Sequence, residues 1–316
     1  MSTVTVENLA KRFGDTQAVV DVSFAVESGE IFGLLGPNGA GKTTTIRMML
    51  DIFKPDAGTV SIFGGTLELD KKRRIGYMPE ERGLYKDQKL EPTLVYLATL
   101  KGLDEKTAQS RLGGWLERLD LAEHRDKKVQ ELSRGMQQKA QIICTLLHEP
   151  DLIVIDEPFS GLDPVNTRLV KQILEEQRQA GRSILMSTHQ MYQVEALCDR
   201  IVLIDEGSTV LYGPVSGIKR NFSGNAVSIE GQGDFSQIPG VLETRHHNGS
   251  WHLALEIGTD PQAVFRALAV RENVKIERFE LAEPSLDDIF VQVVSGRERQ
   301  DGAGELEARR VEARDA

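Results

Sequence analysis

The sequence predicts an α/β protein in which a large domain with a mixed β-sheet precedes a small α+β domain. Apolar segments at 152–155, 184–187 and 201–204 are separated by helical sequence, as is typical of buried parallel strands. Shorter alternating segments within residues 3–32 indicate antiparallel strands. Near residues 213–225 the chain becomes rich in Gly and Ser, and the pattern changes after it. We therefore place a domain boundary there.

Composition limits the possible classes of protein. With 316 residues, of which 40% are hydrophobic, the chain can form one large or two modest domains with a real core. Its formal charge of -10 argues against a nucleic-acid partner. Cys144 and Cys198 lack CxxC or metal-type spacing, so free thiols in a reducing cytosol are expected. No segment approaches the roughly 18 apolar residues of a membrane span, so action at a membrane would require a partner.

A phosphate-binding loop follows the apolar segment 31–35 and precedes helix-compatible residues 44–53. Its glycines let backbone N–H groups and a helix N-terminus face an anion. Lys42 adds a positive charge, and the Thr43 hydroxyl suits Mg²⁺. The motif predicts a nucleoside triphosphate as ligand. The residues expected to hold it are Gly36, Pro37, Asn38, Gly39, Ala40, Gly41, Lys42, Thr43 and Thr44.

Helical sequence occupies most of residues 90–148, after a strand expected at 58–64. Asp104 is a candidate N-cap, and Leu112, Trp115, Leu116 and Leu119 share one face of the helix that follows it. Gly113-Gly114 is expected to weaken the continuity of that helix, at about 1 kcal/mol for each glycine relative to Ala.

Two carboxylates, Asp156 and Glu157, follow the apolar segment 152–155. Ligands of open α/β sheets bind at the carboxyl ends of the strands, so both side chains are expected near the nucleotide. Asp156 is the candidate for holding Mg²⁺ through water, and Glu157 is the candidate for orienting and polarising the attacking water. An acidic turn after a strand is common by itself, but the phosphate loop in the same chain favours the catalytic interpretation.

The small domain is predicted to approach a ferredoxin-like α+β order. A strand at 226–230 precedes a hairpin with an Asn248-Gly249 turn, a helix opened by Asp260-Pro261, a strand at 274–281 and a last helix. The last helix begins with a near capping box from Ser285 to Asp288, with Asp in place of Glu or Gln.

The segment Leu132-Ser133-Arg134-Gly135-Met136-Gln137-Gln138 precedes a helix, with Ser133 as its possible N-cap. Together with the phosphate loop and Asp156-Glu157, in this order, it resembles the signature sequence of ATP-binding cassette (ABC) ATPases over residues 2–215. The resemblance implies a P-loop ABC ATPase fold with a mixed sheet core, an antiparallel β subdomain and a helical subdomain at about 84–146. The expected domains are 1–217 for the ATPase and 224–295 for the accessory domain, with 296–316 as a disordered tail.

Roles for further residues follow from this resemblance. Phe13 looks like the aromatic residue that stacks on adenine, although it is also compatible with an ordinary sheet position. Ser133 and Gly135 resemble the donors that contact the γ-phosphate held by an opposing protomer. Asp163 lies in a segment similar to the loop between the two sites, and His189 matches the switch histidine at the γ-phosphate. Lys42, Glu157 and His189 are the expected catalytic residues.

Two departures from the family pattern stand out. Glu80 occupies the position where a glutamine is usual, and its carboxylate would either hold Mg²⁺ more firmly or slow ATP entry through its added charge. With Thr43 and Asp156 it completes the expected metal site. Arg134 and Met136 replace the commoner glycine and glutamine of the signature. The segments 80–85 and 284–290 resemble bacterial ABC ATPases associated with sodium or drug efflux. The small domain then serves either dimerisation or regulation, or only stabilises the chain.

The resemblance implies the ATP-hydrolysing subunit of an export-type ABC transporter, with ATP and Mg²⁺ as its ligands. A second nucleotide-binding domain, in a homodimer, and a separate multispanning permease are the expected partners, and the cytoplasmic face of the membrane is the expected location. An alternative is a soluble ABC ATPase that acts as an ATP-gated scaffold or regulator of a cytosolic partner. A P-loop kinase or GTPase leaves the signature, Asp163 and His189 without a role.

Overall fold

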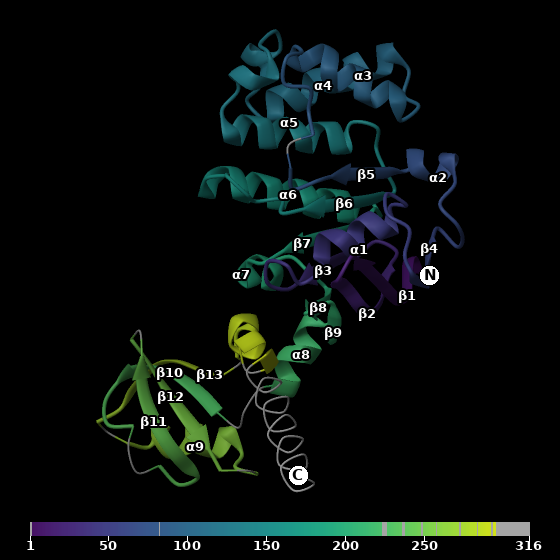
Figure 1. Ribbon diagram of the computed structural model, residues 1–316. Helices are drawn as coiled ribbons and strands as arrows, with labels where there is room; N and C mark the ends of the chain where they lie inside the picture. The colour runs from purple at the N-terminus through teal and green to yellow at the C-terminus, as the bar shows by residue number, and fades with distance from the viewer. Residues whose placement is uncertain are drawn as a thin grey trace, which may run out of the picture. The chain divides into compact units, whose positions relative to one another are not determined.

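The structure, a computed structural model, describes residues 2–294 apart from positions 82, 223–225, 236–237, 248, 257, 272, 283 and 292. The chain divides into two compact units, Met1–Val215 and Ser216–Ala316 (Figure 1). The expected tail at 296–316 lies outside the described residues.

The N-terminal unit is built on a nine-stranded mixed sheet with the order β4-β1-β2-β9-β8-β3-β7-β6-β5. Five adjacent strands in its centre and at one edge are parallel: β3 (Ile31–Leu35), β5 (Ile75–Met78), β6 (Leu152–Asp156), β7 (Ser183–Thr188) and β8 (Arg200–Asp205). The apolar segments predict all of them except β5. Antiparallel pairs join β1 (Ser2–Phe13) to β2 (Thr16–Glu27) on one side and to β4 (Ala57–Ile62) on the other, and join β9 (Ser208–Pro214) to β8. The predicted α/β class and mixed sheet are confirmed.

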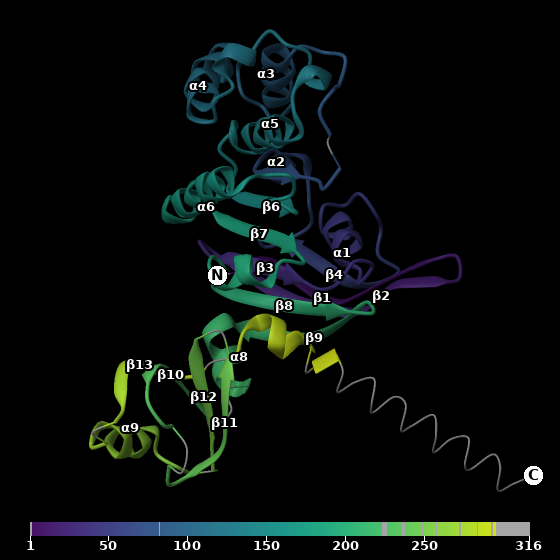
Figure 2. The same ribbon diagram turned by 90° about the vertical axis from the view of Figure 1, so that its left-hand side faces the viewer.

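Burial explains why the central strands form. Every residue of β3, β6 and β7 is buried, because helices cover the sheet: α1 (Lys42–Met49), α6 (Pro164–Gln179) and the short α7 (Met191–Glu195) (Figures 1 and 2). Asp163 caps α6, and Pro164 occupies its first position, where a missing N–H costs nothing. This packing aligns the carboxyl ends of β3, β6 and β7 at one edge of the sheet.

The N-terminal strands are longer than the sequence predicts. β1 and β2 each run for 12 residues, whereas the alternating pattern covers only shorter segments. Asn8 has a φ of 48°, and the register of β1 against β2 shifts between Val6 and Leu9. A bulge with one residue in the left-handed region, which Asn tolerates, lets the strand continue past the irregularity.

Helices α3 (Leu90–Leu100), α4 (Glu105–Arg118) and α5 (Arg134–Leu146) pack on one another beside β5, preceded by the short α2 (Leu69–Arg73) (Figure 1). Asp104 caps α4 as predicted, and its carboxylate accepts the Thr107 N–H at 3.0 Å. The weakened continuity expected at Gly113-Gly114 is not seen, because α4 runs through both glycines. The buried Leu112 and Leu116 hold this turn in place.

The segment expected to be a Gly- and Ser-rich connection instead contains α8 (Val215–Phe222). Val215 and Ile218 are buried apolar residues three positions apart, so one face of a helix can bury both. β9 was also missed, as were β5 and α2, because each is short and has a mixed pattern.

The C-terminal unit has a four-stranded antiparallel sheet with the order β11-β12-β10-β13. The strands are β10 (Ala226–Gln232), β11 (Val241–His247), β12 (Ser250–Leu255) and β13 (Lys275–Leu281), and α9 (Pro261–Ala269) connects the last two. This strand order is that of a ferredoxin-like sheet, but the described residues between β10 and β11 are not helical. A further helix begins after Ser285, whose hydroxyl and N–H bond reciprocally to the N–H and carboxylate of Asp288. The predicted capping box is thus confirmed.

Candidate functional site

The phosphate loop connects β3 to α1 at the carboxyl edge of the sheet, and two of its glycines are required by sterics. Gly36 has a φ of 146°, and a Cβ there would lie 2.1 Å from the carbonyl oxygen of Ile204. Gly41 has a φ of 103°, and a Cβ there would lie 2.5 Å from the carbonyl oxygen of Ala18. Any side chain at either position would displace backbone, so the loop can pack this closely only with glycine.

A cavity of about 250 Å³ opens over this loop. The Lys42 side chain is buried at its base, where Nζ donates to the carbonyl oxygens of Gly36 at 2.7 Å and Pro37 at 2.9 Å. Burial lowers the pKa of Lys42, while the negative charges of nearby carboxylates oppose that effect. The lining residues are Ala18, Asn38, Gly39, Gly41, Lys42, Thr43, Thr44, Glu80, Asp156 and Glu157.

Asp156 ends β6 and is 1% exposed. The Thr43 hydroxyl donates to its Oδ2 at 2.9 Å, and the Ser187 hydroxyl donates to its Oδ1. Ser187 is the register partner of Asp156 on the neighbouring parallel strand β7. The carboxylate is therefore fixed in orientation, with Thr43 from the phosphate loop directly against it.

Glu157 follows in an unfavourable backbone conformation, with a φ of 52°. For a residue with a Cβ, the left-handed region costs roughly 1–2 kcal/mol. Its carboxylate accepts the Thr188 hydroxyl at 3.1 Å and the His189 N–H at 3.0 Å, and it lies 2.7 Å from His189 Nδ1. These bonds fix the orientation of a buried carboxylate that lines the cavity.

The oxygen donors fit a hard cation. The Thr43 hydroxyl and the Asp156 carboxylate lie together, and the exposed Glu80 lines the same cavity. In the described part of the chain, this cavity included, no group of three or more His, Cys, Asp or Glu side chains is placed to hold a metal. That is expected for Mg²⁺, which keeps several waters and binds through one or two carboxylates together with substrate phosphates.

The signature residues and Asp163 lie outside this cavity. Ser133 is exposed and caps α5, with its hydroxyl accepting the Met136 N–H at 3.2 Å. A Cβ at Gly135 would meet the Gly161 carbonyl oxygen at 3.5 Å, so the start of α5 packs against the turn that follows Glu157. Asp163 is also exposed and accepts the Asn166 N–H at 2.9 Å. Hydrogen bonding to Asn166 lowers the pKa of Asp163.

Phe13 also lies outside the cavity, at the end of β1 before the hairpin to β2. Its ring is 44% exposed and packs edge-on against Phe53, with 5.4 Å between the ring centroids. Lys11 Nζ lies over the ring, 5.6 Å from its centroid, and stacking on a purine stays a prediction.

The sequence prediction omitted four residues that the structure brings to the site. Ala18 lines the cavity, Ser187 and Thr188 hold the two carboxylates, and Gln138 reaches the same turn from α5. Ser187 and Thr188 were predictable in principle, because they end an apolar segment parallel to 152–155. For Ala18 and Gln138 no sequence signal distinguishes them from their neighbours.

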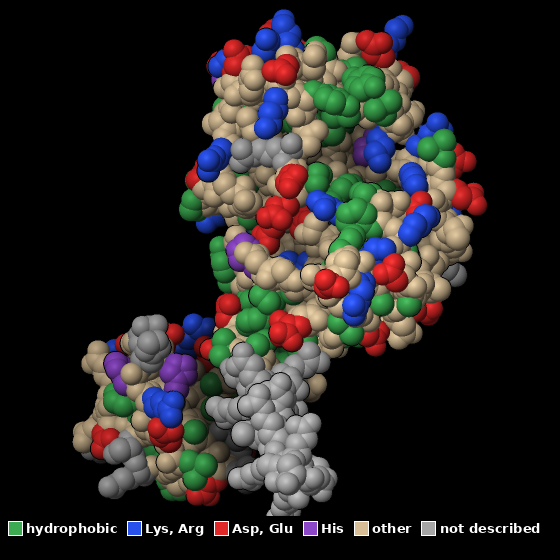
Figure 3. Space-filling view, viewed as in Figure 1, with side chains coloured by type: hydrophobic (Ala, Val, Ile, Leu, Met, Phe, Trp, Pro, Cys, Tyr) green, Lys and Arg blue, Asp and Glu red, His purple; other side chains and the backbone are tan. Residues whose placement is uncertain are grey.

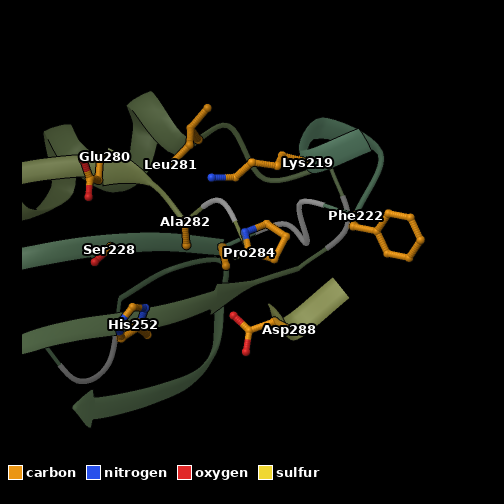
Figure 4. A pocket seen from close by; sticks show the side chains of 10 residues that line it. Lys219, Phe222, Ser228, His252, Glu280, Leu281, Ala282, Pro284 and Asp288 are labelled. Carbon is orange, nitrogen blue, oxygen red and sulfur yellow. The ribbon is translucent and has the colours of Figure 1, made fainter. Parts of the chain in front are cut away.

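A larger cavity, of about 720 Å³, lies in the C-terminal unit (Figure 4). Its lining carries charges of both signs, with Lys219 on one side and Glu280 and Asp288 on others. Asp288 already accepts hydrogen bonds from Ser285. None of the predicted site residues lines this cavity.

The arrangement over the phosphate loop suits one kind of chemistry. A helix N-terminus and a buried ammonium attract an anion of phosphate type. Two fixed carboxylates with separate hydrogen-bond partners provide one group for a cation and one for a water molecule. The site can bind a phosphate ester and orient water against it.

Comparisons with known families agree with this geometry. The family described as ABC transporter matches residues 19–160, which include the phosphate loop, the signature and both carboxylates. A family described as ATP-binding protein DrrA1-3-like, C-terminal domain, matches residues 213–294. A family described as AAA domain, putative AbiEii toxin, Type IV TA system, matches residues 128–195, which overlap the first match.

Several relatives align with this chain over almost its whole length. The uncharacterized ABC transporter ATP-binding protein YhaQ of Bacillus subtilis is 40% identical, over 92% of this chain and 98% of its own length. Nod factor export ATP-binding protein I of Burkholderia lata is 34% identical over 93% and 97%, respectively. Linearmycin resistance ATP-binding protein LnrL of Bacillus subtilis is 29% identical over 93% and 99%. A solved structure of an ATP-binding subunit of an ABC transporter superposes with a TM-score of 0.66 at 35% identity, covering 70% of this chain and 93% of that one.

Proposed function

This chain belongs to the ABC transporter ATP-binding proteins, a family of ATPases, and on that basis we propose that it drives a separate membrane permease for export. The observation that carries the proposal is the joint placement of Lys42, Asp156 and Glu157 in one cavity over the phosphate loop. Chains that only bind a nucleotide would need no strained glutamate held by two partners from the next strand.

ATP is proposed to bind with its phosphates against the loop from Gly36 to Thr44. The backbone N–H groups at the start of α1 face the anion, and the Lys42 ammonium exchanges its carbonyl partners for phosphate oxygens. Phe13 offers an exposed ring for the purine. Thr43 and Asp156, with Glu80 on the cavity rim, would hold Mg²⁺.

Hydrolysis is assigned to Glu157 as the group that orients and deprotonates water. Thr188 and His189 fix its carboxylate, so the acceptor oxygen points toward the γ-phosphate position without reorganisation. His189 stays 52% exposed and can reach the γ-phosphate while its ring remains beside Glu157. Mg²⁺, when bound, would neutralise charge on the β- and γ-phosphates.

A second nucleotide-binding domain is proposed to complete the site. Ser133, Gly135 and Asp163 lie at the exposed ends of α5 and α6 rather than in the cavity, which suits contacts with a nucleotide held by another chain. Closure on ATP and reopening after hydrolysis would then supply motion, because the γ-phosphate links the two halves.

A permease is proposed to dock on the helical region. A largely apolar cavity of about 310 Å³ lies between the end of β5 and helices α3 and α5, lined in part by Met78, Leu84 and Leu97. Hydrophobic side chains gather on the face over α3 (Figure 3), where Tyr96 and Leu100 are more than half exposed. Within the described residues, no helix has the length and apolarity required to cross a bilayer.

From the relatives, we propose that transport runs in the direction of export and that this chain is located at the cytoplasmic face of the membrane. Two of them are named for Nod factor export and for linearmycin resistance. Both align over almost their whole length, so the C-terminal unit is included in the similarity.

The proposal is tested by isolating the native complex, reconstituting it in vesicles and measuring ATP-dependent export. The expected result is a multispanning partner whose transport activity is lost with Lys42→Ala and retained with Lys54→Ala, an exposed lysine outside the cavity. A purely soluble native assembly would overturn the transport function and support the alternative of an ATP-gated scaffold.

A further inference from the structure

Gln138 is a buried polar residue on α5 for which the proposed mechanism gives no role. Its side chain is 5% exposed. Its Nε2 donates to the carbonyl oxygen of Glu157 at 3.3 Å and to that of Pro158 at 3.1 Å. A buried amide that donates to two consecutive carbonyls of one turn constrains the direction of both peptide planes.

The turn that Gln138 contacts carries the strained Glu157. With a φ of 52°, this residue depends on its surroundings to keep its conformation. Its N–H donates to the Ser187 carbonyl at 3.0 Å, and its carbonyl accepts the Ser160 N–H at 3.2 Å in addition to the Gln138 amide. Glu157 is thus held from β7, from its own turn and from α5, and only the third contact comes from the helical region.

Gln138 shares a helix face with the signature. It lies three residues after Gly135, so both face the same neighbour. Gly135 packs against the Gly161 carbonyl and Gln138 bonds to the start of the same turn. The first turns of α5 and residues 157–161 therefore form one contact surface, and a displacement of the signature end of α5 would be transmitted to the Glu157 backbone.

We propose that Gln138 is a positioning residue for hydrolysis, which links the signature helix of a chain to Glu157 of the same chain. Gln138 does not touch the nucleotide. It sets the direction of the Glu157 peptide and so the aim of the carboxylate. This inference rests on the proposed role of Glu157 as the base.

The test compares Gln138→Ala with Gln177→Ala in the full-length protein. Gln177 is a buried glutamine of α6 that lies outside the site, and its Oε1 accepts a hydrogen bond from Arg182. Gln138→Ala is expected to lower kcat for ATP at least tenfold, as for one misplaced catalytic group, with KM within about twofold of wild type. Gln177→Ala is expected to keep kcat within about threefold of wild type. Equal kcat values for the two variants would overturn the proposal.

A second comparison separates positioning from a general structural effect. In a Glu157→Gln background, Gln138→Ala is expected to change the residual turnover by less than about twofold, because both changes act on the same step. A loss as large as in the wild-type background would show that Gln138 acts independently of Glu157 and would refute the inference. Gln138→Glu, which keeps the shape but loses the amide donors, serves if the alanine variant does not fold. A wild-type chain that releases no phosphate from ATP would instead refute the proposed function.

Discussion

Asp156 and Glu157 are 1% and 6% exposed and are bonded to Thr43, Ser187, Thr188 and His189 of the same chain. Ser133 and Asp163, by contrast, are exposed, and the hydrogen bonds described for their side chains go to residues three positions further along the helices that they cap. The region around Asp156 and Glu157 is preorganised by contacts within the chain, whereas Ser133 and Asp163 are helix N-caps on its surface. This contrast suggests that the phosphate-loop half of the site can function as a binder alone, and that turnover depends on what the exposed half meets.

The strongest test of the preorganised half is Glu157→Gln. We expect turnover to fall by about 10²–10⁴-fold, the usual contribution of a general base, since an amide cannot take a proton from water. Binding of ATP and ATP-dependent dimerisation should persist, because the amide keeps the size of the side chain. Phosphate release and light scattering with and without ATP measure the two properties. Unchanged turnover would remove Glu157 from the role of base.

The exposed half is tested by Ser133→Ala. We expect turnover to fall about tenfold to a hundredfold, as for the loss of one donor to the transferred phosphate, with ATP binding by the single chain unchanged. The matched control is Asp104→Ala, which also removes an N-cap, at about 1 kcal/mol of stability, but on α4. Steady-state ATPase assays and thermal melts compare the two variants. If both lose turnover equally, the effect of Ser133 is only that of a lost cap.

Mixing variants would test whether the two halves come from different chains. Lys42→Ala should be nearly inactive alone, and Ser133→Ala should keep about a tenth of wild-type turnover or less. A dimer of one Lys42→Ala chain and one Ser133→Ala chain has one intact composite site out of two. At equal concentrations about half of the dimers are mixed, so up to about a quarter of wild-type turnover is expected. No recovery on mixing, with dimers formed, would contradict the shared site.

Glu80→Gln probes the rim of the cavity with a smaller expected effect. Losing one negative charge near the metal should raise the Mg²⁺ concentration for half-maximal ATPase activity about fivefold, which corresponds to about 1 kcal/mol of charge interaction in a solvated setting. ATP binding should be retained. Magnesium titrations of the ATPase activity give the answer, with Glu81→Gln as the adjacent control. Superimposable titrations for wild type and Glu80→Gln would exclude Glu80 from the metal site.

His148 follows α5, and its Nε2 lies 3.2 Å from the carbonyl oxygen of Ile75 on β5, so it joins the helical region to the sheet. This contact is tested by pH, and no effect on turnover at neutral pH is expected. Burial, with the nearby Lys101 charge, lowers the pKa of His148 to about 4. The unfolded chain, with a His pKa of about 6.5, binds the proton more readily. Stability is therefore intact above pH 6.5 and falls between pH 6.5 and 4, by on the order of 2 kcal/mol. Between pH 7.5 and pH 5, the urea midpoint of the wild type should fall more than that of His148→Gln. An equal fall in the two proteins would contradict this.

Much of the preorganised half was predictable, because each of its parts ends an apolar segment. The phosphate loop, Asp156-Glu157 and Ser187-Thr188-His189 all follow buried strands, and parallel strands bring their carboxyl ends to one edge. Gln138 was not predictable, since its distance from Glu157 depends on how the helical region packs on the turn. The prediction of a weaker helix at the two α4 glycines failed for a related reason. Packing of the buried Leu112 and Leu116 outweighs the low helix propensity of glycine. The strand order of the small unit followed its hairpin and crossover signals, whereas α8 lay within a segment with a loop-like composition.

The left-handed backbone of Glu157 has a consequence for protein engineering and for natural variation. At such a position glycine relieves the steric conflict, and Asn tolerates it better than Glu does. A library of this protein selected only for resistance to heat would be expected to accumulate Gly or Asn at position 157, together with loss of turnover. Thermostability ranking alone would thus select against the residue that the chemistry needs, and any stabilised variant should be screened for phosphate release before it is used.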